Sequence, residues 1–206
     1  MFDLDGTLVH TAPEYRYKVV GRTLDKLCVR HADKRDIDSF WFGGNRDALI
    51  RECFGLKPEL FWEEYVRHDT IELRKRFMKV YDDVDFIPEL RRNGYKTGVV
   101  TGAPVHVANF EMDMLGEKNF DALVLARQEN KLLPKPSSQG LELCLGVLKV
   151  DRDKAMYVGN SDEDMEMARG ANVLDVFVDR GEHEFPDLRP SVTVRSLYEL
   201  RALLTI

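Results

Sequence analysis

The residues with the clearest potential for chemistry stand near the start of the chain, in the segment Asp3-Leu4-Asp5-Gly6. Two carboxylates at positions i and i+2 of an extended segment point to the same side of the backbone, and Gly6 permits a sharp turn after them. Like charges so close together repel each other unless a cation joins them. Magnesium suits such a pair because it prefers oxygen ligands and keeps positions for water and a phosphate oxygen. Spacing alone leaves an ordinary acidic turn open as the alternative.

The elements that would position these carboxylates show best in the second half of the chain, where short apolar runs alternate with amphipathic stretches. The runs 95–101, 122–126, 155–159 and 174–178 predict buried strands. Helices are predicted between them: one through about Leu115, one that starts near Ser137 as its N-cap, and one that ends near Gly170. This alternation predicts an α/β fold with a doubly wound parallel sheet. In such sheets catalytic groups lie beyond the carboxyl ends of the strands.

Residues 11–79 break the alternation and contain no convincing strand. Apolar residues recur there at helical steps, in the sets Val19, Val20, Leu24, Leu27, Cys28 and Trp62, Val66, Leu73, Phe77. We therefore predict two domains: a catalytic core of residues 1–10 and 80–206, and an inserted helical domain of residues 11–79. Because the insertion follows the acidic segment directly, it is well placed to cover a site.

The composition narrows the partners and the cellular location. A chain of 206 residues with 44% apolar residues can bury a full core, and its formal charge of −6 argues against nucleic-acid or anionic-membrane binding. No run approaches the roughly 18 apolar residues of a membrane span, and no signal peptide is recognisable. The three cysteines form no CxxC pair, as expected for reduced thiols in the cytosol. We expect a soluble, cytoplasmic monomer or homodimer.

Four segments together resemble the motifs of the haloacid dehalogenase-like (HAD) hydrolase superfamily. Its first motif reads Asp-x-Asp-Gly-Thr/Val, as does Asp3–Thr7. Thr101-Gly102 after an apolar run resembles the second motif, Lys135-Pro136 the third, and Gly159-Asn160-Ser161 followed by Asp164 the fourth, usually Gly-Asp-Ser-x-x-Asp. Taken alone, these are a capping hydroxyl, a solvated lysine and an acidic first helical turn. Their joint order, over almost the whole chain, is far more specific.

The resemblance implies a Rossmann-like core with an inserted helical cap, as in phosphoglycolate phosphatases and β-phosphoglucomutases. Asp3 would attack phosphorus and form an aspartyl-phosphate, while Asp5 would protonate the leaving alcohol and then deprotonate the attacking water. Thr101 and the amide of Gly102 would bind the phosphoryl oxygens. Lys135 would hold both Asp3 and the phosphate. Superfamily members that cleave carbon–halogen or phosphonate bonds lack the second acid, so Asp5 indicates phosphoester chemistry.

The resemblance also implies a Mg²⁺ cofactor, held by Asp3, the backbone carbonyl of Asp5, Asn160, and Asp164 directly or through water. Asn160 departs from the usual aspartate. An amide oxygen can still bind magnesium but brings no negative charge, so we expect a higher magnesium requirement unless Asp162 or Asp164 compensates.

A second departure is that only Met1 and Phe2 precede the nucleophile, where the family normally has several strand residues. Either the natural chain begins earlier, or the central strand is unusually short. A missing half-strand would leave unpaired backbone groups on its neighbours.

The cap of this subfamily supplies specificity residues from a loop between helices. The best candidate is the segment 42–46, Phe-Gly-Gly-Asn-Arg, in which Arg46 could bind a substrate carboxylate or a second phosphate. A solvent-facing arginine in a helix–helix turn is the alternative. His10, at the start of the insertion, is either a hinge residue or a substrate contact.

The function predicted from the sequence is a phosphoric monoester hydrolase, a magnesium-dependent phosphatase of a small phosphorylated metabolite, with phosphoglycolate the first compound to test. A phosphomutase of the β-phosphoglucomutase type uses the same motifs. A catalytically weak phosphate-binding or regulatory protein is the alternative from another class, but such a protein has no use for Asp5.

Overall fold

The computed structural model describes residues 1–204. The chain divides into two compact units: a core unit of Met1–His10 with the residues from Val80 onward, and a helical unit of Thr11–Lys79. Strands β1 (Val9–Thr11) and β2 (Met78–Val80) carry the chain out of the core unit and back, and they form a two-stranded sheet. Within residues 1–204, no helix is long and apolar enough to cross a membrane.

The core unit is built on a parallel sheet. Its strands are β3 (Gly98–Thr101), β4 (Ala122–Leu125), β5 (Met156–Gly159), β6 (Leu174–Val178) and β7 (Val192–Val194). β3 pairs with β4, and β5, β6 and β7 pair in that order, all in parallel. Phe2 joins the two groups, because it bridges Val99 of β3 and Val158 of β5 in parallel. The amino-terminal segment therefore occupies the centre of the sheet.

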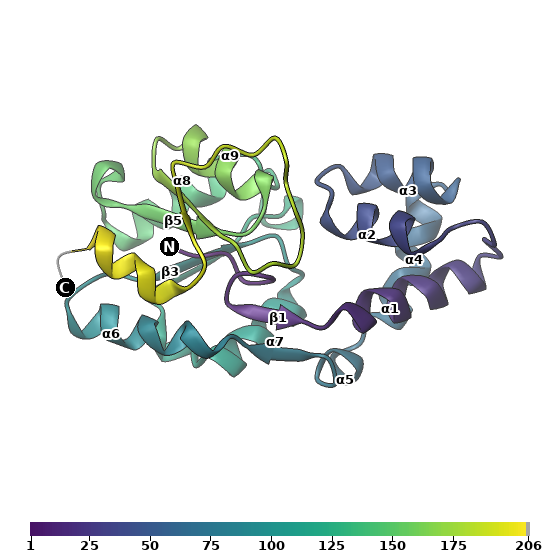
Figure 1. Cartoon of the computed structure of the whole chain (residues 1–206), viewed down its shortest axis with the longest axis horizontal. Helices are drawn as coiled ribbons and strands as arrows, with labels where there is room; N and C mark the ends of the chain where they lie inside the picture. Colours follow the sequence, from purple (N-terminus) through teal and green to yellow (C-terminus); the bar gives the residue numbers. More distant parts are fainter. Residues whose placement is uncertain (205–206) are drawn as a thin grey trace. The chain divides into compact units, whose positions relative to one another are not determined.

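Helices cover both faces of this sheet. The core unit contains α6 (Phe86–Arg92), α7 (Val105–Leu115), α8 (Gln139–Leu148) and α9 (Asp162–Gly170), and the short 3-10 helices η1 (Asp82–Asp85), η2 (Glu117–Asn119), η3 (Gln128–Asn130), η4 (Arg152–Lys154) and η5 (Leu197–Leu203). In Figure 1, α8 and α9 lie on one side of β3 and β5, and α6 and α7 lie on the other. The predicted doubly wound α/β fold is confirmed.

Three details differ from the sequence prediction. β3 begins at Gly98 rather than at residue 95. α8 begins at Gln139 after Ser138, so the predicted N-cap Ser137 is one position too early, although its hydroxyl accepts a hydrogen bond from the Gln139 amide at 3.4 Å. β7 is not predicted, because three residues with one half-buried, one exposed and one buried side chain leave little periodic signal.

The short central segment is hydrogen-bonded to both of its neighbouring strands. The Phe2 amide donates to the Gly98 carbonyl at 2.9 Å, and the Met1 ammonium donates to the Met156 carbonyl at 2.8 Å. The Asp3 amide donates to Val158 at 3.0 Å. β3 and β5 begin at Gly98 and Met156, level with the first residues of the chain. These backbone groups of Met1, Phe2 and Asp3 are therefore paired with β3 and β5.

The helical unit consists of α1 (Pro13–Lys26), α2 (Lys34–Phe42), α3 (Arg46–Phe54), α4 (Pro58–His68) and α5 (Ile71–Arg74). Its core is an apolar cluster formed by Tyr15, Val19, Val20, Leu24, Ile37, Phe40, Ile50, Phe54, Phe61, Tyr65 and Leu73. Phe40, Phe54 and Phe61 pack with ring centroids 5.0–5.5 Å apart. The unit therefore has an apolar core of its own.

The helical pattern read over residues 62–77 is wrong in detail. α4 ends at His68, and the Thr70 hydroxyl then accepts from the Leu73 amide to start α5. Val66 is 64% exposed, whereas Phe61 and Tyr65, one position earlier, form the buried face of α4. In the other predicted set, Cys28 lies beyond the end of α1 and is exposed.

Candidate active site

A buried ion cluster lies at the carboxyl ends of the central strands. The Lys135 ammonium donates to Asp3 Oδ1 at 2.5 Å and to Asp164 Oδ1 at 2.7 Å. Asp3 follows the central segment, Lys135 precedes α8, and Asp164 lies in the first turn of α9. The side chains of Lys135 and Asp3 are each 10% exposed and that of Asp164 is 1% exposed. One ammonium is thus shared by two carboxylates that have little access to water.

The electrostatics of this cluster follow from burial. Burial raises the pKa of Asp3 to about 7; Lys135 opposes this rise, and the Asp164 carboxylate adds to it. Burial alone would lower the pKa of Lys135, but the carboxylates of Asp164 and Asp3 outweigh it and raise that pKa above its usual value. A single ammonium does not balance two buried carboxylates, so the site retains an excess of negative charge.

Asp164 is held by five donors from the protein. Its Oδ2 accepts from the Asn160 amide, the Ser161 amide and the Ser161 hydroxyl, at 2.8–3.1 Å. Its Oδ1 accepts from Lys135 and, at 3.3 Å, from the Tyr157 hydroxyl. A Cβ at Gly159 would lie 2.4 Å from Asp164 Cγ, so only glycine fits at this strand end. These contacts anchor Asp164 to Lys135 and to the amino terminus of α9, and its metal-binding role stays a prediction.

Asn160 lies against the acidic turn. The Thr7 hydroxyl donates to Asn160 Oδ1 at 3.1 Å. Gly6 has a φ of +73°, and a Cβ there would lie 2.1 Å from Asn160 Nδ2, so the turn can approach the asparagine only with glycine at this position. The amides of Thr7, Leu8 and Val9 all donate to the Leu4 carbonyl, which closes the turn tightly. Two motifs more than 150 residues apart in sequence thus meet.

The remaining predicted core residues lie at the same end of the sheet. Thr101 ends β3 and is 2% exposed, and its hydroxyl accepts from the Ala103 amide at 3.1 Å. The Gly102 carbonyl accepts from Arg127 at 2.8 Å. Asp5 is half-buried, and its backbone pairs in parallel with Val9. Asp3, Lys135, Asp164 and Asn160 are linked by short hydrogen-bonded steps, and Thr101 lies at the end of β3.

Arg46 belongs to the helical unit. It opens α3, is exposed, donates to the Trp41 carbonyl at 3.3 Å and lies 5.9 Å from the Phe40 ring centroid. These local contacts fit an arginine in a helix–helix turn. Its substrate-binding role stays a prediction.

The donor atoms at the acidic turn fit magnesium in kind. The Asp3 carboxylate, the Asp5 carbonyl and the Asn160 amide oxygen are all hard oxygen donors, and the cluster has an excess of negative charge that a divalent cation would balance. Among the described residues, no group of three or more histidine, cysteine, aspartate or glutamate side chains is arranged to hold a metal. Of these three donors, only the Asp3 carboxylate is a charged side chain, because Asn160 stands where the motif usually has an aspartate.

Sequence reasoning missed two side chains close to these residues. Tyr157 is fully buried, its hydroxyl donates to the Val100 carbonyl at 2.8 Å, and Lys135 Nζ lies 5.6 Å from its ring centroid. A tyrosine within a predicted strand is usually a core residue, so no signal singled it out. Arg180 donates to the Thr7 carbonyl, and nothing in the sequence links these two positions.

Comparisons with known proteins agree on one family. A family model described as haloacid dehalogenase-like hydrolase matches residues 1–178. N-acetylmuramic acid 6-phosphate phosphatase from Pseudomonas putida is 28% identical over 176 residues, covering 83% of this chain and 78% of its own. Phosphoglycolate phosphatase from Aquifex aeolicus is 28% identical over 178 residues, covering 83% and 79%.

The solved structures extend the likeness of fold over the whole chain. A hydrolase of the haloacid dehalogenase-like family from Streptococcus pneumoniae superposes with a TM-score of 0.75 at 20% identity. The match covers 98% of this chain and 95% of the other.

Proposed function

The chain belongs to the haloacid dehalogenase-like hydrolase family, and from this premise we propose that it is a magnesium-dependent phosphatase of a small phosphorylated metabolite. The observation that carries the proposal is the buried cluster in which Lys135 joins Asp3 to Asp164 beyond the strand ends. A carboxylate beside a fixed cation, and largely removed from water, is a suitable nucleophile for a phosphate ester.

In the first displacement, a carboxylate oxygen of Asp3 bonds to phosphorus while the bond from phosphorus to the ester oxygen breaks. Lys135 holds Asp3 Oδ1, so Oδ2 is the oxygen that can attack. Asp5, two residues on, gives its proton to the departing alkoxide. In the second displacement, Asp5 takes a proton from water, and the resulting hydroxide attacks phosphorus and releases Asp3 and inorganic phosphate.

The remaining core residues bind and orient the phosphoryl group. Thr101 and Gly102 would donate to its oxygens at the end of β3, and Lys135 would offset charge as it builds in the transition state. A magnesium ion would be held by the Asp3 carboxylate, the Asp5 carbonyl and the Asn160 amide oxygen. When bound, it supplies the positive charge that lets a dianionic ester approach a carboxylate.

The helical unit would act as the cap that excludes water and selects the substrate, with residues 42–46 as its specificity segment. Phosphoglycolate is the first compound to test, and the relatives add N-acetylmuramic acid 6-phosphate. Both carry an anionic group besides the ester, which Arg46 could bind.

The test is hydrolysis of a panel of phosphorylated metabolites, including both compounds and glucose 1-phosphate, with Mg²⁺ and with a chelator. Asp3→Asn serves as the inactive variant, and Asp153→Asn, an exposed aspartate of η4, is its matched control. We expect phosphate release that needs Mg²⁺ and is lost only in Asp3→Asn. Equal rates in wild type and Asp3→Asn would contradict the proposal, and isomerisation of glucose 1-phosphate without hydrolysis would replace it with a mutase.

A further inference from the structure

Arg180 is a buried arginine of the core unit, and none of the motifs includes it. It follows β6, and its side chain is 6% exposed. Its Nη1 and Nη2 donate to the two carboxylate oxygens of Asp83 at 2.7 and 3.0 Å. Its guanidinium carbon lies 4.0 Å from the Tyr81 ring centroid. The Asp83 carboxylate therefore holds one edge of the guanidinium, and the Tyr81 ring holds one of its faces.

The same guanidinium also reaches the acidic turn. Nη2 and Nε donate to the Thr7 carbonyl at 2.7 and 3.3 Å. Thr7 in turn donates its hydroxyl to Asn160 Oδ1. Arg180 therefore holds the backbone at one side of Thr7, while the Thr7 side chain holds Asn160.

Asp83 provides a rigid base for this contact. It is 8% exposed and also accepts from the Ser196 hydroxyl at 3.0 Å and the Leu197 amide at 2.7 Å. Burial raises the pKa of Asp83, but hydrogen bonds from Arg180 and Leu197 outweigh it and keep that pKa below its ordinary value. The carboxylate thus stays charged and links η1, the start of η5 and Arg180.

We propose that Arg180, anchored on Asp83, is a positioning residue of the phosphatase, which sets the orientation of Thr7 and through it the Asn160 amide oxygen. The inference rests on the proposed function and adds a residue to its machinery. A lysine could not replace the arginine, because one ammonium cannot present parallel donors to a carboxylate and a further pair to a carbonyl. Groups that hold metal ligands in place typically contribute about 10- to 100-fold to affinity or activity.

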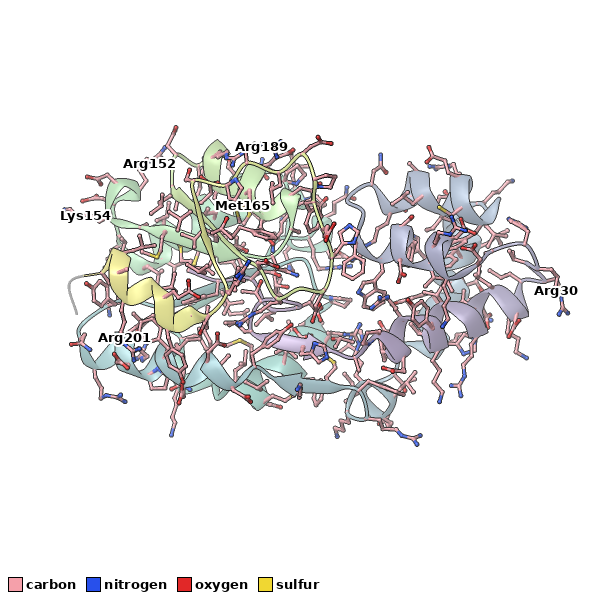
Figure 2. The ribbon with its side chains drawn as sticks, in the orientation of Figure 1. Arg30, Arg152, Lys154, Met165, Arg189 and Arg201 are labelled. Carbon is pink, nitrogen blue, oxygen red and sulfur yellow. The ribbon has the colours of Figure 1, made fainter. Side chains whose placement is uncertain are left out.

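The experiment compares Arg180→Met and Arg180→Lys with Arg201→Met. Arg201 is a matched control because it also forms a two-bond pair, with Glu89 at 2.6 and 3.0 Å, and lies over the Phe86 and Tyr198 rings. It is carried by η5 and is labelled in Figure 2. Amide hydrogen exchange of residues 4–9 and steady-state kinetics are measured for each variant.

For Arg180→Met we expect a kcat about 10- to 100-fold lower with a nearly unchanged KM. We also expect faster exchange in residues 4–9 and an unchanged rate in β4. The kcat and exchange rates of Arg180→Lys should lie between those of Arg180→Met and wild type, and those of Arg201→Met should match wild type.

Unchanged exchange in residues 4–9 would overturn the proposal, and so would an equal loss of kcat in Arg201→Met. If Arg180→Met fails to fold, Arg180→Lys becomes the test of the proposal. A wild-type kcat and wild-type exchange rates in Arg180→Lys would overturn it. A wild-type chain that hydrolyses no ester would defeat the proposed function instead, while the exchange rates of the turn would still report whether Arg180 holds it.

Discussion

Both units of this chain have an apolar core, and they differ in the charged groups that they bury. The helical unit packs aromatic rings around Phe40 and Phe61, whereas the core unit encloses the charged cluster of Asp3, Lys135 and Asp164. Apolar burial stabilises a fold, while burying an unbalanced carboxylate costs stability. The comparison indicates that the core unit gives up stability at the place where we propose chemistry, because two carboxylates are buried there around one ammonium.

One feature occurs in both units and sharpens the contrast. Arg74 and Asp69 of the helical unit form a two-bond pair, 7% and 8% exposed, with the guanidinium 5.2 Å from the Tyr15 ring centroid. Arg180 and Asp83 are 6% and 8% exposed. The two pairs are therefore nearly equally buried but have different neighbours. Arg74 also contacts the Met78 sulfur, whereas Arg180 also donates to the Thr7 carbonyl in the acidic turn. Burial of an ion pair does not by itself reveal a role.

The largest expected effect is that of Asp3→Asn. Loss of the nucleophile should lower kcat by ~10³-fold or more. The same change should raise the melting temperature, because burial has raised the pKa of Asp3 to about 7 and its charge is therefore costly at neutral pH. Steady-state hydrolysis and thermal unfolding measure the two effects, with Asp153→Asn as control. A lower melting temperature would show that Asp3 stabilises the core unit, and the contrast between the units would fail.

Phe61→Ala tests the other side of the comparison. Phe61 is fully buried among Phe40, Phe54 and Tyr65, so its removal should cost about 3–5 kcal/mol of unfolding free energy. Val66→Ala, on the same helix but 64% exposed, should cost little. Exchange protection should fall in residues 11–79 and stay unchanged in β3 and β5. Equal loss in both regions would mean that the two units unfold as one.

The sequence predicted the architecture better than it predicted the contacts. The family, its enzyme class and the doubly wound fold are confirmed, because strand–helix alternation and the order of the motifs are signals that a single sequence carries. The bonds from Arg180 to the Thr7 carbonyl and from Tyr157 to the Val100 carbonyl join residues 173 and 57 positions apart, so they depend on how distant segments of the sheet pack together. Roles for the site residues, the magnesium ion and the cap stay predictions.

Arg74→Met separates a stabilising pair from a positioning pair. Removing one partner of a buried pair leaves a carboxylate uncompensated, which costs about 3 kcal/mol of unfolding free energy. We expect that loss for Arg74→Met together with wild-type exchange in residues 4–9. Differential scanning calorimetry and exchange measured on the same samples provide the readout, with Arg180→Met beside it. Faster exchange of the turn in Arg74→Met would remove the distinction between the two pairs.

A smaller effect is expected at Asn160. Asn160→Asp adds a carboxylate beside the acidic turn, so half-saturation with Mg²⁺ should need about 10-fold less metal. Calorimetric titration of Mg²⁺ without substrate measures this directly. Asp162→Asn, at the first residue of α9, tests whether a neighbouring acid compensates, since this change should then weaken Mg²⁺ binding. A titration of Asn160→Asp that matches wild type would show that residue 160 does not contact the cation.

The smallest effect concerns acid stability. The pKa of Asp83 lies below its ordinary value of 3.8, so the folded chain releases that proton more readily than the unfolded chain. Stability from the Asp83–Arg180 pair is therefore present above pH 3.8 and is lost as the pH falls through the lower, folded pKa. Asp83→Asn should reduce the slope of unfolding free energy against pH in this acid range by at most about 1.4 kcal/mol per pH unit.

Glu129→Gln is the control. Hydrogen bonding from Arg127 also lowers the pKa of Glu129, but the Glu129 side chain is 68% exposed and water screens the pair. Urea unfolding between pH 2 and 5 gives both curves. An equal reduction of this slope in Glu129→Gln and in Asp83→Asn would show that burial does not strengthen the Asp83–Arg180 pair, and the contrast between buried and exposed pairs would fail.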